Sequence, residues 1–286
     1  MSIFADARDY LLNLRDRQRM TIALTRGSIA LGSRHVDLTK PETWEFSGFS
    51  QNGEDGILHV LRGQLTKSNR TFIEIGIEDG VECNSAWLIV AEKYSGVLVE
   101  GNPRFAARAR RLLARQSTGV ECLTMFVTKE NVQRLKGAAL YGDPDVFSLD
   151  IDGNDYYVAQ SILSAGFRPK IFVVEYNAVF GPSRSLTIPY RADFDYAQAH
   201  GSRLYYGVSI AGWKRFFAAQ GYRFVTVDRN GVNAFFVDPS CYRRDFLKRV
   251  KGADFAENRY QLGKFRKPSD EQFRLIADLE FVTIDT

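Results

Sequence analysis

Short apolar runs alternate with amphipathic stretches along most of the chain. The apolar runs are rich in Val, Ile, Leu and Phe, which is typical of buried strands. They are predicted as strands at 72–76, 96–100, 120–126, 146–152 and 170–177. Amphipathic stretches predict helices at 83–93, 156–165 and 209–220, and Pro103 suits the first turn of another helix. This alternation predicts an α/β fold, in which helices cover a parallel sheet.

The last two strands are predicted to form a hairpin. The segment YRFVTVDRNGVNAFFV contains two apolar runs joined by Asn230 and Gly231. Asn-Gly favours a tight hairpin turn because both central positions of such a turn need positive φ. The prediction is therefore a Rossmann-like, mostly parallel sheet of seven strands with an antiparallel terminal hairpin.

The chain length of 286 residues favours one sizeable core with additions. Residues 1–45 are predicted to be a helical N-terminal extension, and residues 46–238 the main domain. Residues 239–286 are polar and charged, and we expect them to pack on this domain as a surface tail.

The first β-α-β unit carries the most informative chemistry. Glu74 ends the first strand, Gly76 and Gly80 follow it, and Glu100 ends the second strand. Glycines at such a turn let a ligand approach the backbone, and an acid about 20 residues beyond the turn is where related folds bind a ribose diol. An acid at position 74 would repel a pyrophosphate but attract the cationic end of S-adenosylmethionine (SAM). The pattern therefore favours SAM over NAD.

Together with EIGIEDG, the phrases FSQNGEDGI (49–57), SLDIDGNDY (148–156) and VVEYN (173–177) resemble the FkbM-like methyltransferases of bacterial polysaccharide and natural-product gene clusters. The resemblance covers about residues 48–238 and implies the class I SAM-dependent methyltransferase fold. It implies that Glu74 and Gly76 bind the methionine part of SAM and that Glu100 binds the ribose. The chain departs from the family pattern E/DxGxGxG at Glu78, whereas Gly80 is retained.

Further residues are predicted to bind the cofactor. Asn102 lies beside Glu100 and suits the diol or the adenine, while Gln51 and Asp55 precede the first strand and suit the amino-acid end of SAM. The alternative for residues 50–55 is a helix N-terminus capped by Ser50. Asp150, at the end of the fourth strand, is a further candidate for contact with SAM.

A second polar cluster follows the fourth and fifth strands, whose carboxyl ends share one edge of a parallel sheet. Asp150 and Asp152 are two residues apart, which would place them on one face of a strand. Oxygen ligands of this kind suit Mg²⁺ or Mn²⁺. By resemblance to metal-dependent O-methyltransferases, the predicted ligands are Asp152, Glu175 and Asn177. The alternative is that these acids contact SAM, cap helices or form turns without metal, since DGND is itself a turn sequence.

Methyl transfer to a hydroxyl needs alignment and a base. The candidate catalytic residues are Asp152, Asp155 and His200. His200 lies in the segment 178–206, whose Tyr, Phe, Arg and Asp side chains could hold a sugar ring or could pack on the sheet. The predicted acceptor is therefore a sugar hydroxyl of a glycan or a glycan precursor.

Two other classes of function stay open. Asp150-Ile151-Asp152 matches the DxD motif of metal-dependent glycosyltransferases, although such an enzyme would not need the EIGIEDG turn. A binding module without catalysis is the third hypothesis, and the departure at Glu78 favours it. Ligand binding would discriminate among the three.

Composition limits the partners and the compartment. The net charge of +4 gives little attraction for nucleic acid, and no zinc-finger or RNP-type motif is present. No apolar run approaches the roughly 18 residues of a membrane span, and the first 20 residues have no apolar signal region. Cys83, Cys122 and Cys241 have no metal-site spacing, so reduced packing cysteines are expected. We therefore expect a cytoplasmic protein, with oligomerisation left open.

Overall fold

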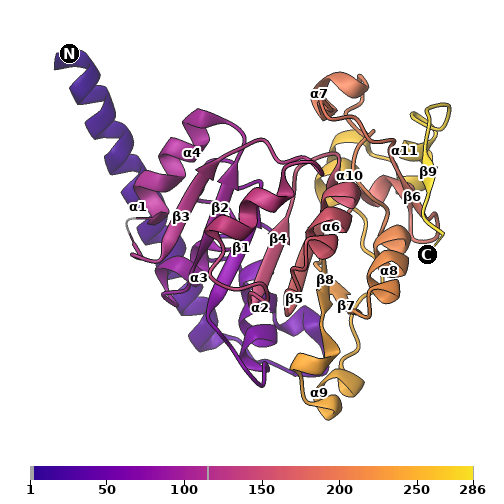
Figure 1. Cartoon of the computed structure of the whole chain (residues 1–286), viewed down its shortest axis with the longest axis horizontal. Helices are drawn as coiled ribbons and strands as arrows, with labels where there is room; N and C mark the ends of the chain where they lie inside the picture. The colour runs from indigo at the N-terminus through magenta and orange to yellow at the C-terminus, as the bar shows by residue number, and fades with distance from the viewer. Residues whose placement is uncertain (1–2, 115, 286) are drawn as a thin grey trace.

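A central sheet of seven strands organises the molecule (Figure 1). The computed structural model describes residues 3–114 and 116–285. The strand order in the sheet is β3-β2-β1-β4-β5-β8-β7. The strands β1 to β5 pair in parallel, whereas β8 is antiparallel to both β5 and β7. This topology is the class I methyltransferase fold and confirms the fold class predicted from the sequence.

The seven strands of the central sheet lie close to the predicted positions, and two short strands outside it, β6 and β9, were not predicted. Their bounds are β1 Thr71–Ile75, β2 Ser95–Glu100, β3 Val120–Thr124, β4 Val146–Leu149, β5 Ile171–Glu175, β6 Leu186–Thr187, β7 Arg223–Val227, β8 Asn233–Val237 and β9 Val282–Thr283. The helices are α1 Ile3–Ser33, α2 Glu54–Gly63, α3 Ala86–Val90, α4 Pro103–Ala109, α5 Leu135–Ala138, α6 Asp155–Ser164, α7 Tyr196–Ala199, α8 Ile210–Ala219, α9 Arg244–Arg249, α10 Arg259–Phe265 and α11 Ser269–Phe273.

Two apolar cores sandwich the sheet because alternate strand residues point to opposite faces. Phe72 and Leu98 pack on one face with residues of α1, α2, α3 and α4. Ile73 and Val97 pack on the other face with residues of α6 and α8. The strands are therefore covered on both sides, which explains why they are apolar along their whole length.

The two ends of the chain pack on this core in different ways. The helix α1 contributes Met20 and Ala23 to the first core, and in Figure 1 its N-terminal part extends beyond the sheet. The C-terminal segment contains α9, α10 and α11, and its strand β9 pairs with β6. Ile276 and Phe180 pack together in a smaller apolar cluster. The C-terminal segment thereby fixes the loop that follows β5.

Two details differ from the sequence prediction. The hairpin of β7 and β8 is present, but only Gly231 of the predicted pair has positive φ, because the connection is longer than a two-residue turn. The strand β4 ends at Leu149, so Asp150 and Asp152 lie beyond it. Asp152 has a φ of 53°, and the two acids therefore approach each other through a turn, not through strand alternation.

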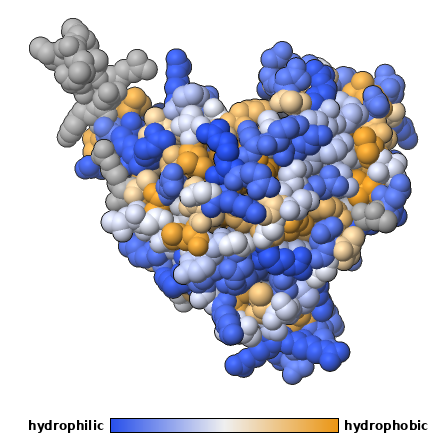
Figure 2. Space-filling view, viewed as in Figure 1, coloured by the Kyte–Doolittle hydropathy of each residue, from blue (hydrophilic) through white to orange (hydrophobic). Residues whose placement is uncertain are grey.

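The face in Figure 2 is mostly hydrophilic and is interrupted by small apolar patches. Of the helices in the described part of the chain, none combines the length and the apolar character that crossing a membrane requires.

Candidate active site

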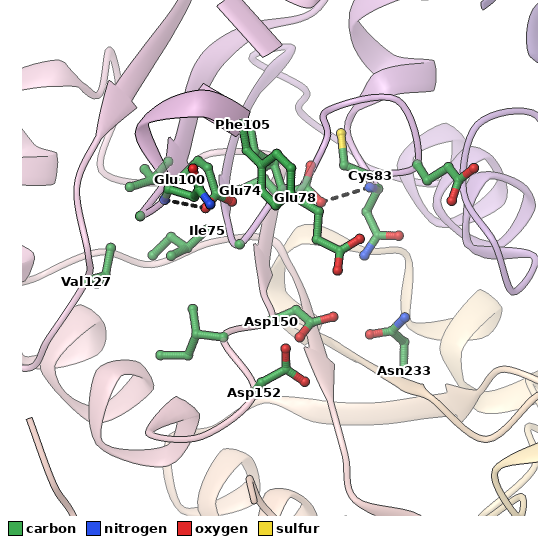
Figure 3. Close-up of a pocket in the computed structure, with 18 of the residues that line it drawn as sticks. Glu74, Ile75, Glu78, Cys83, Glu100, Phe105, Val127, Asp150, Asp152 and Asn233 are labelled. Atoms are coloured by element: carbon green, nitrogen blue, oxygen red, sulfur yellow. Dashed lines mark hydrogen bonds between the residues drawn. The ribbon is translucent and has the colours of Figure 1, made fainter. Parts of the chain in front are cut away.

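A cavity of about 520 Å³ opens at the carboxyl ends of β1, β2 and β4 (Figure 3). Open parallel sheets bind ligands at this edge. The lining combines acids, amides and apolar side chains, among them Gln51, Asn52, Glu54, Glu74, Gly76, Glu78, Glu82, Cys83, Asn84, Glu100, Asn102, Phe105, Phe126, Asp150, Asp152 and Asn233. Its volume is within the usual range for a small-molecule or cofactor site.

The lining is strongly acidic. Seven carboxylic acids line the cavity, namely Glu54, Glu74, Glu78, Glu82, Glu100, Asp150 and Asp152. Among the described residues that line it, there is no lysine, arginine or histidine. A half-enclosed acidic cavity attracts cations and repels polyanions such as a free diphosphate. The electrostatics of the cavity therefore favour a positively charged ligand, a metal ion, or both.

Glu74 is the buried acid at the end of β1. Its carboxylate accepts hydrogen bonds at 2.8 Å from the backbone N–H groups of Asn84 and Ser85, and it also accepts one from the Ser85 hydroxyl. Burial nevertheless raises the pKa of Glu74. The carboxylate fixes the start of α3 and thereby the loop beneath the cavity. Cys83, which the sequence marked only as a packing residue, also lines the cavity, and burial raises the pKa of its thiol.

The turn after β1 needs glycine at position 76 but not at position 78. Gly76 has a φ of 84°, and a Cβ atom there would lie 1.6 Å from the carbonyl oxygen of Asp150. Glu78 replaces the middle glycine of the family pattern and has a φ of 46°, so it adopts the same left-handed region with a side chain. A left-handed non-glycine residue at a cavity is the kind of strain that functional sites retain.

Gly76→Ala should destabilise the protein by at least about 2 kcal/mol, because the new methyl group meets backbone and the φ is unfavourable. Urea unfolding would measure this loss. Gly137→Ala is the matched control, since Gly137 lies in α5 with open space around it and alanine is the better helix former. Equal stability of the Gly76→Ala protein and the wild type would contradict the close approach of the two strands.

Glu100 and Asn102 lie together at the end of β2. One oxygen of Glu100 accepts the backbone N–H of Asn102 at 2.7 Å, and the Asn102 side chain caps α4 by accepting the N–H of Arg104. None of the described residues donates a hydrogen bond to the second oxygen of Glu100. Phe105 and Phe126 line the same end of the cavity and are 39% and 59% exposed. Two exposed rings beside a carboxylate are suited to a flat polar ligand.

Of the two residues predicted in the loop before α2, Gln51 lines the cavity and Asp55 does not. Gln51 lines the cavity and donates to Glu82 at 2.9 Å. Asp55 lies beneath the loop, is only 1% exposed, and accepts the backbone N–H groups of residues 48, 49 and 50. Burial raises its pKa to about 7. Asp55 therefore holds the loop, whereas the neighbouring Glu54 lines the cavity.

The second acidic cluster is formed by Asp150, Asp152 and Glu175. One oxygen of each carboxyl group lies within 4.8 Å of the others. No ion pair joins any of these three to a lysine or arginine of the described residues. Tyr206 donates a hydrogen bond to Glu175 at 3.3 Å. The cluster therefore concentrates negative charge, and only a proton or a bound cation can balance it.

Burial and mutual repulsion raise the pKa values in this cluster. The pKa values of Asp150 and Glu175 lie well above their ordinary range, mainly because the protein shields these half-buried groups from water. The charges of Asp152 and Asp155 raise the pKa of Asp150 further, and those of Asp150 and Asp152 raise that of Glu175. The pKa of Asp152 is raised to about 7, by burial and then by the charges of Asp155 and Glu78. Perturbed carboxyl groups in a cleft are typical of functional sites.

Two residues predicted for this cluster are bound elsewhere. Asn177 is fully buried, donates to the carbonyl groups of Leu204 and Tyr206, and accepts the N–H of Val179. Both ends of its amide are thus used, and Asp150 takes its predicted place in the cluster. Asp155 is buried and accepts the backbone N–H groups of residues 151 and 153, so it stabilises the DGND turn and does not line the cavity.

His200 follows α7 and is also absent from the described lining of the cavity. Its Nδ1 atom lies 2.7 Å from the hydroxyl of Ser202. Other residues of the same segment do approach the acids. Tyr206 reaches Glu175, and Phe194 contacts Gly153, where an added Cβ atom would lie 2.4 Å from its ring. The segment 178–206 therefore borders the cluster through aromatic rings, while His200 faces its own loop.

Basic residues hold the loop after β1 from outside the cavity. Arg19 of α1 donates to Asp79 at 2.8 Å and to Glu82 at 2.6 Å, and Arg108 of α4 donates to Asp79 at 2.9 Å. Arg108 also pairs with Asp16 of α1. The helix α1 is thus tied to the loop that carries Glu78.

Arg19→Ala should increase amide hydrogen exchange in residues 77–82, because Asp79 and Glu82 lose a shared cation. Mass spectrometry of the exchanged peptides would measure this. Arg17→Ala is the control, since Arg17 is exposed on the same helix and its side chain makes no ion pair in the described part of the chain. Unchanged exchange in residues 77–82 of the Arg19 variant would show that α1 does not order the loop.

No family model matches the chain, and no curated protein matches its sequence. Several solved structures do match. An O-methyltransferase from Bacillus cereus, in complex with S-adenosylhomocysteine (SAH), shares 17% identity, covering 77% of this chain and 89% of its own, with a TM-score of 0.43. The O-methyltransferase TomG of Streptomyces achromogenes, involved in tomaymycin synthesis and in complex with SAM, shares 18% sequence identity. The match covers 74% of this chain and 93% of TomG, with a TM-score of 0.41. An SAH-bound methyltransferase of Podospora anserina shares 14% sequence identity. The match covers 74% of this chain and 92% of that protein, with a TM-score of 0.43.

Proposed function

We propose that the protein is a SAM-dependent O-methyltransferase that acts on a sugar hydroxyl of a glycan or glycan precursor. The observation that carries this proposal is the acidic cavity at the carboxyl ends of β1 and β2. SAM carries a sulfonium and an ammonium group, and its ribose diol can donate to Glu100. A cavity with seven acids and no described basic lining residue suits this ligand better than a dinucleotide.

Each part of SAM has a counterpart in the cavity. The free oxygen of Glu100 suits the ribose diol, and the exposed rings of Phe105 and Phe126 suit the adenine. The amides of Gln51, Asn52 and Asn84 can serve the amino-acid end, because SAM's carboxylate needs donors. Glu78 faces the cavity where the sulfonium would be attracted.

The acids Asp150, Asp152 and Glu175 fit a divalent metal. Three hard oxygen donors converge there without a cationic partner among the described residues, and Mg²⁺ and Mn²⁺ prefer such ligands. When bound, the ion would hold an acceptor diol and lower the pKa of its hydroxyl. Without the metal ion, the same three carboxyl groups would have to bind protons.

Methyl transfer forms a bond between the acceptor oxygen and the methyl carbon while the carbon–sulfur bond breaks. Both electrons of the broken bond go to sulfur, whose positive charge disappears. The hydroxyl proton passes to a base, and Asp152, which lines the cavity beside the proposed acceptor site, is the candidate for this role. The aromatic segment 178–206 would form the wall on which the sugar lies.

Calorimetry with SAM, SAH and UDP-sugars, each with and without Mn²⁺, tests the assignment. We expect SAM and SAH to bind without metal, and labelled methyl groups from SAM to reach a sugar acceptor only before exhaustive EDTA treatment. Binding of a UDP-sugar that needs Mn²⁺, with no binding of SAH, would replace the proposal by a glycosyltransferase. Binding of SAH with full transfer after EDTA would remove the metal from the proposal but keep the methyltransferase.

A further inference from the structure

One buried polar atom at the cavity lacks a partner among the described residues, the carboxamide oxygen Oδ1 of Asn233. Asn233 begins β8, lines the cavity and is 4% exposed. An unpaired buried acceptor costs free energy comparable to a lost hydrogen bond. Such an atom beside a cavity can accept a hydrogen bond from a bound group or serve as a ligand to a bound cation.

The orientation of this amide is determined by Glu54. The Nδ2 atom of Asn233 donates to Glu54 at 2.8 Å, and the same carboxylate also accepts from the side chain and backbone of Asn52. Reversing the Asn233 amide would bring its oxygen against carboxylate oxygens. Its oxygen must therefore point away from Glu54, and in Figure 3 it is turned towards Asp150.

The sheet register places this oxygen beside the acidic cluster. Asn233 pairs directly with Glu175 across β5 and β8, and residues in such a pair project from the same face with neighbouring side chains. Continuing the register of β4 and β5 by one residue pairs Glu175 with Asp150. Asp150, Glu175 and Asn233 thus form one row along the sheet edge, and Asp152 completes the cluster from its turn.

We propose that Asn233 supplies an amide oxygen ligand to a divalent metal ion held by Asp150, Asp152 and Glu175, and that Glu54 positions it for this role. Asparagine carbonyl oxygens are common ligands of hard cations. A cation would satisfy the unpaired oxygen and the three carboxylates together. The inference rests on the proposed function, in which the metal serves the acceptor, and it adds the amide oxygen of Asn233 to the three carboxylates.

The assignment is tested by titrating the full chain with Mn²⁺ at pH 8 without SAM. Electron paramagnetic resonance of the free ion measures how much Mn²⁺ is bound. Wild type should bind the ion at the cluster, so that Asp152→Asn abolishes binding. Asn233→Ala should raise the Kd for Mn²⁺ by at least about tenfold, since even outer-shell changes cost about that much. Asn233→Asp should retain binding, because a carboxylate oxygen replaces the amide oxygen. If Asn233→Ala does not fold, Asn233→Ser replaces it in the experiment, and the same loss of Mn²⁺ affinity is expected.

Asn13→Ala is the control, because Asn13 lies on α1 outside the described lining of the cavity. It should bind Mn²⁺ as the wild type does. Unchanged Mn²⁺ affinity in Asn233→Ala overturns the inference, as does loss of SAH affinity without loss of Mn²⁺ affinity, which would assign the oxygen to SAM's ammonium group. The proposed function fails separately, if the wild type binds no SAH.

Discussion

Glu100→Ala should weaken the binding of both SAM and SAH by about 2–4 kcal/mol, because it removes the carboxylate that can accept from the two ribose hydroxyls. The structure leaves one oxygen of Glu100 free at the cavity and fixes the other on the N–H of Asn102. The carboxylate is therefore already oriented before the ligand binds. SAM and SAH share the ribose, so the loss should be equal for the two ligands. Titration calorimetry of both ligands measures it.

Glu121→Ala is the matched control for this experiment. Glu121 lies on the adjacent strand β3, is exposed, and is not part of the described lining of the cavity. Its removal changes the net charge by the same amount and should leave both affinities unchanged. If both variants bind SAM and SAH equally more weakly, the effect is a general electrostatic one. If Glu100→Ala binds them as tightly as the wild type, the ribose does not lie at the end of β2.

The sheet was predictable because its signals are local. Apolar runs covered on both faces identify strands without knowledge of their neighbours, and an acid at or just beyond the carboxyl end marks β1, β2, β4 and β5. The end of β4 was the exception. Asp150 and Asp152 continue an apolar run in the sequence, but the strand ends at Leu149 and Asp152 adopts a left-handed backbone beyond it. The spacing of apolar residues along the sequence does not reveal such a turn.

The partners of individual polar side chains were harder to predict. Asp55 and Asn177 have the right residue types beside the right motifs, yet both are buried and bind nearby backbone groups. Short polar side chains often bind local backbone, and the sequence alone does not say which of them stay free. Asn233 was missed for the opposite reason. Its place beside Glu175 follows from the pairing of β5 with β8, which is a long-range contact.

The metal-free protein should lose stability as the pH rises from about 4 to above 7. Carboxyl groups in an unfolded chain have pKa values near 4. Folding raises the pKa of Asp152 to about 7 and those of Asp150 and Glu175 further. Between the unfolded and folded pKa values the folded state binds more protons, so the free energy of unfolding falls with increasing pH. Thermal unfolding in EDTA at pH 5, 6, 7 and 8 measures this decline.

Mn²⁺ should reverse the decline, and its effect should grow with pH, because the ion competes with protons for the same oxygens. At pH 8 the ion should raise Tm clearly, whereas at pH 5 the protonated cluster should respond little. Asp55 and Asp228 also have raised pKa values, about 7 and about 8, so they add to the pH slope but should not respond to the ion. Asp152→Asn should therefore flatten the slope in part and remove the response to Mn²⁺, while Asp193→Asn, an exposed control, should change neither. An equal rise in Tm at pH 5 and pH 8 would mean that the ion binds elsewhere, and the acids at the ends of β4 and β5 would then be held together by shared protons.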